Sequence, residues 1–169
     1  HSYVRGNWRN LAEAGPMILA KCCHDLDILT WTLRQPVVWM NSFGSLTWFK
    51  PENAPMGAPH RCTDGCPVAD SCKYYAPRIY TQVASEYMRW IVSMDRSDDA
   101  IMEALRTGPY GRCVYHCDND VVDHQTLNME LADGATLTMT MQGQGDYEGR
   151  TMRYDGTKAT LYGKFSEGN

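Results

Sequence analysis

Residues 126–141 read TLNMELADGATLTMTM, and this stretch decides the fold class. Its apolar side chains stand at every second position, in the order Leu127, Met129, Leu131, Leu137, Met139 and Met141. This alternation has the period of β-strands that bury one face and expose the other. Asp133-Gly134, at the centre, is a signal for a tight hairpin turn. The stretch therefore predicts two antiparallel strands joined by a short turn.

The flanking sequence predicts the remaining elements. Helices are expected from Pro16 until Pro36 stops the pattern, and at residues 78–93 and 97–107. Further strands are expected at residues 37–48, 150–154 and 159–162. Residues 1–15 predict a loop or short strand, and the proline-rich residues 50–77 predict a long loop. The order indicates an α+β fold: a mostly antiparallel open sheet with helices on one face and a long Pro/Cys-rich loop.

Composition sets the broad class of the protein. The 169 residues are 43% hydrophobic and 21% charged, so residues 1–169 are expected to form a single domain. The net charge of −4 comes without a basic patch, so we expect no nucleic-acid partner. No apolar run reaches the length of about 18 residues typical of a membrane span. The seven cysteines are an odd number, which favours reduced thiols and a cytoplasmic location over a secreted disulfide framework.

The first predicted helix carries candidate reactive groups. At 100° per residue, Lys21, His24, Asp25 and Ile28 fall on one stripe, with Lys21 and Asp25 spaced for an ion pair. A histidine beside an ammonium and a carboxylate is suited to proton transfer near neutral pH. The same pattern is also that of an ordinary solvated helix face. The residues alone leave both interpretations open.

The long loop carries a candidate metal site. HRCTDGCPVADSC, residues 60–72, places Cys62, Cys66 and Cys72 close together, and three thiolates fill most of a tetrahedral zinc site. The fourth ligand is open among His60, Cys113 and Cys117. A loop disulfide or free cysteines remain the alternatives. Cys22, Cys23 and His24 are not candidates, because neighbours on a helix diverge by about 100° and cannot converge on one ion.

The polar segment GPYGRCVYHCDNDVVDHQ, residues 108–125, carries candidate substrate contacts. Tyr110, Arg112, Asp123 and His124 offer hydrogen-bond donors and acceptors, which a polyhydroxylated substrate needs when its hydroxyls leave water. The alternative is a polar loop that leads into an edge strand.

Four phrases together resemble a known family. They are MILAKCCHDLDILTW (17–31), RCTDGCPVADSCKYYAPRIY (61–80), ALRTGPYGRCVYHCDNDVVDHQ (104–125) and GTKATLYG (156–163). In this order they resemble the C-terminal domain of the glucose–fructose oxidoreductase / inositol dehydrogenase / MocA (Gfo/Idh/MocA) family, in the branch with a cysteine-bearing loop. The resemblance implies an NAD(P)-dependent oxidoreductase that acts on sugars, polyols or related compounds. It also implies a homo-oligomer formed through the sheet.

The resemblance assigns His24 the role of the helix histidine beside the reacting carbon, and Asp27 a structural role. Many family members carry an aspartate four residues before that histidine, where this chain has Ala20, so Lys21 is expected to share the proton-transfer role. No G-x-G-x-x-G fingerprint and no Glu-Lys-Pro motif occurs. The expected NAD or NADP would therefore bind a Rossmann domain outside this sequence, and the chain alone is expected to be inactive. The alternative function is a non-catalytic carbohydrate- or protein-binding module with a metal-stapled loop.

Overall fold

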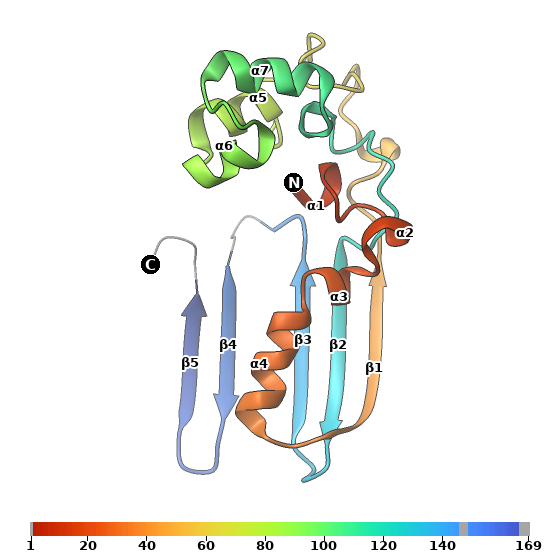
Figure 1. Ribbon diagram of the computed structural model, residues 1–169. Coiled ribbons are helices and arrows are strands. Elements are labelled where there is room, and N and C mark those ends of the chain that lie inside the picture. The colour runs from red at the N-terminus through yellow and green to blue at the C-terminus, as the bar shows by residue number, and fades with distance from the viewer. Residues whose placement is uncertain (1, 146–148, 166–169) are drawn as a thin grey trace.

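The computed structural model describes residues 2–145 and 149–165, which form a sheet with one long helix and a separate region of short helices and loops (Figure 1). The α-helices are α1 (Ser2–Arg5), α2 (Leu11–Ala14), α3 (Met17–Ala20), α4 (Cys23–Leu33), α5 (Ala76–Arg78), α6 (Glu86–Val92) and α7 (Asp98–Thr107). The strands are β1 (Val37–Ser45), β2 (His124–Leu131), β3 (Thr136–Gln142), β4 (Arg150–Asp155) and β5 (Thr160–Phe165). The 3₁₀-helices η1 (Pro51–Asn53) and η3 (Pro109–Gly111) and the π-helix η2 (Ile79–Val83) complete the order.

The predicted hairpin is confirmed. Strands β1, β2 and β3 form an antiparallel sheet in that order, and β4 pairs with β5 in a separate antiparallel ladder. Leu127 lies opposite Met139 and Met129 opposite Leu137, so the apolar side chains of both strands share a face. Gly134 adopts a φ of 84° in the turn, a conformation that glycine tolerates best. The α+β class with antiparallel sheets is thereby confirmed.

The helix predicted before Pro36 is two helices. Lys21 and Cys22 form a turn between α3 and α4, and α4 ends at Leu33 with Arg34 in the left-handed conformation. In Figure 1, α4 runs down roughly along the strands, between β4 and β3. Cys22, in the turn, is buried, whereas Leu19 of α3 is 64% exposed. The prediction of one continuous helix was therefore wrong.

Two other sequence predictions need correction. Residues 1–15, predicted as loop or strand, contain the short helices α1 and α2. The helix predicted at 78–93 is interrupted, because the backbone of Ala84 is extended and the Ser85 side chain caps α6 by accepting from the Met88 amide. In contrast, the helix predicted at 97–107 is confirmed as α7, capped by Ser97 and followed by Gly108.

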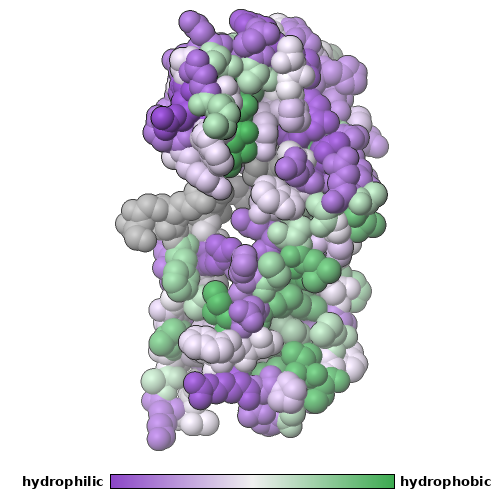
Figure 2. Space-filling model, in the orientation of Figure 1, coloured by the Kyte–Doolittle hydropathy of each residue, from purple (hydrophilic) through white to green (hydrophobic). Residues whose placement is uncertain are grey.

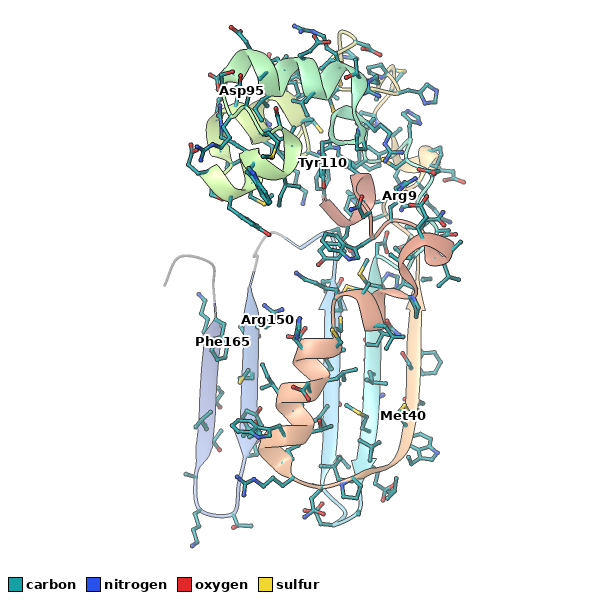
Figure 3. The ribbon with its side chains drawn as sticks, in the orientation of Figure 1. Arg9, Met40, Asp95, Tyr110, Arg150 and Phe165 are labelled. Atoms are coloured by element: carbon teal, nitrogen blue, oxygen red, sulfur yellow. The ribbon has the colours of Figure 1, made fainter. Side chains whose placement is uncertain are left out.

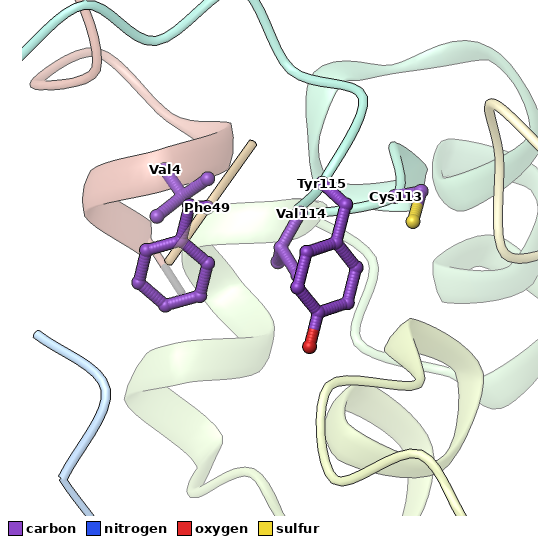
Figure 4. Close-up of a cluster of buried hydrophobic side chains, with 5 residues drawn as sticks. All are labelled: Val4, Phe49, Cys113, Val114 and Tyr115. Carbon is purple, nitrogen blue, oxygen red and sulfur yellow. The ribbon is translucent and has the colours of Figure 1, made fainter. Parts of the chain in front are cut away.

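Two clusters of buried hydrophobic side chains lie outside the sheet. One cluster joins α1 to the loops on either side, and Figure 4 shows its members Val4, Phe49, Cys113, Val114 and Tyr115. A second cluster lies among α5, η2 and α7, with Cys62, Ala76, Tyr80, Ile101 and Leu105. These clusters hold the long loop against the helices. The two clusters therefore lie around the cysteine-bearing loop, while Leu127, Met129 and Leu131 form a further buried row on β2.

The helical region and the half that holds the strands also differ in the hydropathy of their surfaces. Figure 2 shows mainly hydrophilic side chains over the helical region and apolar ones over the half that holds α4 and the strands. Trp31 of α4 and Met40 of β1 are 71% and 57% exposed. Within the described residues, no helix has the length and apolar character that crossing a membrane requires.

Candidate functional site

His24 lies in the first turn of α4, with an exposed side chain. The next residue, Asp25, forms an ion pair with Arg150 of β4, and Figure 3 shows Arg150 beside the start of α4. Lys21 lies in the turn before the helix, where its ammonium is 4.8 Å from the centre of the Tyr3 ring. The structure thus brings His24 and Lys21 to one exposed corner at the N-terminus of α4.

The expected Lys21–Asp25 pair is not formed in the part of the chain that the structure describes. The i,i+4 spacing pairs side chains only on a continuous helix, and Lys21 lies outside α4. Arg150 pairs with Asp25 instead of Lys21, and its hydrogen bond to Asp25, together with the charge of that carboxylate, raises the Arg150 pKa. Burial raises the pKa of Cys22, so this thiol stays neutral at pH 7 and is no nucleophile. The side chains exposed at this corner include the imidazole of His24, the ammonium of Lys21 and the thiol of Cys23.

Asp123 is buried at the start of β2 and organises the chain that follows β1. Its carboxylate accepts hydrogen bonds from the backbone amides of Thr47, Trp48 and Phe49, the shortest being 2.6 Å from Trp48. It also lies 3.0 Å from Nδ1 of His124. Burial alone would raise the pKa of Asp123, but these hydrogen bonds outweigh burial and lower it. The carboxylate is therefore ionised at neutral pH and fully engaged by the protein.

Tyr110 lies in η3, in the helical region (Figure 3), and Arg112 directly follows η3 and lines a cleft with Arg9. Tyr110 packs edge-to-face on Tyr80, and burial raises its pKa. Arg112 donates to the carbonyl of Arg5 and pairs with Asp118. Within the described residues, no hydrogen bond or ion pair joins Tyr110 or Arg112 to Asp123 or His124. The substrate-contact role of these four side chains stays a prediction.

Arginines that the sequence did not single out line a polar cleft of about 300 Å³ beside α1. They are Arg5, Arg9 and Arg61, together with the predicted Arg112. Arg61 donates to the carbonyls of Leu105 and Gly108 at the end of α7, while Arg9 and Arg112 share Asp118. No short motif signals this cleft, because its arginines come from three separate segments. Most of their donors are already used by the protein.

The cysteines predicted to bind metal do come together. Cys62, Cys66 and Cys72 line one small cavity, and Cys113 joins them from the segment before β2. All seven cysteines are free thiols, and burial raises the pKa of both Cys72 and Cys113. With their side chains as they stand, the described residues include no group of three or more metal-ligating side chains that could hold an ion. The zinc site remains a prediction.

Comparison with known proteins identifies no relative of this chain. No protein-family model matches the chain, and neither a curated protein nor a solved structure matches it.

Proposed function

We propose that this chain is the substrate-binding and oligomerisation domain of an NAD(P)-dependent oxidoreductase of the Gfo/Idh/MocA family. Its substrate would be a sugar, polyol or related compound, and its location the cytoplasm. The observation that carries the proposal is the exposed corner of Lys21 and His24 at the start of α4. Two titratable groups face solvent there, neither of them in an ion pair with a carboxylate of residues 2–145 or 149–165, on a helix anchored to β4 by Asp25 and Arg150.

The proposed chemistry assigns each group at this corner a step. The substrate carbon loses a hydride to the nicotinamide of NAD(P)⁺, which a separate dinucleotide-binding domain would supply. The neutral imidazole of His24 takes the proton of the reacting hydroxyl and returns it in the reverse direction. The ammonium of Lys21 stabilises the negative charge that develops on the oxygen. This division of roles suits a chain with Ala20 in place of the aspartate found in many family members.

The open face of the sheet supports the proposed homo-oligomer. Trp39 and Phe43 of β1 are 55% and 73% exposed and share their face with the threonines of β3. Large exposed aromatic side chains on a regular sheet are typical of protein–protein contacts. A second copy of the same face would cover them. The same exposure also suits the alternative function, a non-catalytic module that binds a carbohydrate or a protein.

Replacement of His24 tests the proposed role. In the protein that joins this chain to its dinucleotide-binding domain, His24→Ala should lower kcat by about 10²–10⁴, because a general acid–base group contributes that much. Thr32→Ala is the matched control, since Thr32 is also exposed on α4 but bonds only to the Ile28 carbonyl. Steady-state kinetics with a panel of sugars and polyols measures both variants. An unchanged kcat for His24→Ala would remove His24 from the mechanism.

Two further observations separate the enzyme from the binding module. The reading frame upstream of His1 should encode a strand, a glycine-rich turn and a helix, the elements of a dinucleotide-binding domain. Calorimetry of this chain alone with NAD⁺ or NADP⁺ should detect no tight binding, and no turnover should follow. A start codon directly before His1 would favour the binding module. Cofactor turnover by the isolated chain would contradict the proposed division into two domains.

A further inference from the structure

Four cysteines from distant parts of the sequence line one cavity. Cys62, Cys66 and Cys72 come from the long loop, and Cys113 follows η3. Cys62 and Cys113 are 5% and 8% exposed. The cavity has a volume of about 10 Å³, enough for one water-sized atom. Four thiols around a space of that size match the ligand number of a structural zinc site.

The backbone holds the two halves of this cluster together. The Cys62 amide donates to the Gly111 carbonyl and the Cys113 amide donates to the His60 carbonyl, both at 2.8 Å. These bonds flank the isolated bridge between Arg61 and Arg112. Cys62 therefore lies opposite Gly111 and Cys113 opposite His60, which makes the two cysteines diagonal neighbours on one face of a short antiparallel pairing. Cys66 and Cys72 line the same cavity from the loop, so all four thiols face one space, although their side chains do not converge on an ion as they stand.

Arg5 supplies an independent observation. This arginine is fully buried and lines the same cavity. It donates to the carbonyls of Arg112 and Tyr74, both at 2.6 Å, and its Nη2 lies 3.5 Å from the sulfur of Cys62. In the described part of the chain, no carboxylate forms an ion pair with it. A buried cation requires a nearby negative charge, and a zinc ion with four thiolates carries a net charge of about −2.

We propose that Cys62, Cys66, Cys72 and Cys113 bind one zinc ion, with Arg5 as the buried counter-cation. On binding, each thiol loses its proton to solvent and each sulfur turns to within about 2.3 Å of the ion. The two other candidates for the fourth ligand, His60 and Cys117, do not line the cavity, and Cys117 donates to the Cys113 carbonyl. A single ion suits the small cavity better than an iron–sulfur cluster. The site would fasten the long loop to the segment before β2.

Metal analysis of the purified chain tests the proposal. Elemental analysis should find about one zinc per chain. Cys66→Ser and Cys113→Ser should each lower the affinity of the chain for zinc, as measured by competition with a chelator. The expected loss is at least the ~10–100-fold that removal of an outer-shell partner of a metal site typically causes. Cys23→Ser is the matched control, because Cys23 is an exposed cysteine on α4. Cys117→Ser should also retain zinc. Loss of zinc from Cys117→Ser but not from Cys113→Ser would overturn the assignment of the fourth ligand.

A second measurement needs no variant and covers the case in which a serine variant fails to fold. The unmodified chain is stripped with chelator, and alkylation of its cysteines is followed by mass spectrometry with and without added zinc. Zinc should slow the alkylation of the four proposed ligands and leave that of Cys23 unchanged. Circular dichroism establishes that the fold is intact. A folded chain whose four thiols gain no protection would overturn the proposal, and iron with acid-labile sulfide would overturn the choice of zinc.

Discussion

Asp123 should contribute more to stability than any other carboxylate described above. Its oxygens accept hydrogen bonds from three consecutive backbone amides, those of Thr47, Trp48 and Phe49. Asp123→Ala leaves all three donors without an acceptor. Because Phe49 is 2% exposed, water cannot replace the lost bond there, whereas Thr47 lies at the surface. At about 1–3 kcal/mol per buried donor left unpaired, we expect the free energy of unfolding to fall by about 3–4 kcal/mol.

Asp123→Asn separates charge from hydrogen bonding. One amide oxygen can still accept from Trp48 and Phe49, so the expected loss is only about 1–2 kcal/mol. Asp70→Ala serves as the control: Asp70 is exposed, and its replacement should change stability by no more than about 0.5 kcal/mol. Urea unfolding followed by circular dichroism measures all three variants. A loss below about 1 kcal/mol for Asp123→Ala would refute the assignment of Asp123 as the organiser of residues 47–49.

Two other predictions concern acid stability and steric fit. The hydrogen bond from Arg9 lowers the pKa of Asp118 to about 2, so the stabilisation by this carboxylate is present above its unfolded pKa of about 3.9 and is lost as pH falls toward 2. Because Asp118 is 60% exposed, Asp118→Ala should cost about 1 kcal/mol or less at pH 7, and urea titrations should show the difference vanish near pH 2. A difference that persists there would contradict the ion-pair origin. Gly111→Ala would place a methyl group 1.7 Å from the Leu105 carbonyl oxygen and should lower the free energy of unfolding by about 3 kcal/mol or more. Gly134→Ala, which meets no atom within 4 Å but has a φ of +84°, should cost only about 1–2 kcal/mol, and equal losses in thermal melts would contradict the clash.

Local sequence patterns were sufficient to predict the β2–β3 hairpin and α7. Alternation over residues 126–141 and the Asp133-Gly134 turn involve neighbours in the chain, so they can be recognised without knowing what packs against them. The interruption at Ala84 also had a local signal, because Ser85 followed by glutamate is typical of a helix N-terminus. The break between α3 and α4 had no comparable signal. There the pattern of apolar residues continues across Lys21 and Cys22, although the backbone does not.

The sequence by itself determined the α+β class, the hairpin, the long loop and the grouping of three cysteines within it. Only the tertiary structure decided that Cys113 lines the same cavity, that Arg5 lies buried beside it with no ion pair to a carboxylate of the described residues, and that Asp123 holds residues 47–49. The physical reason is the separation along the chain. Propensity and periodicity act over a few residues, whereas contacts between residues 50–100 positions apart depend on how the whole chain closes, which local patterns do not encode.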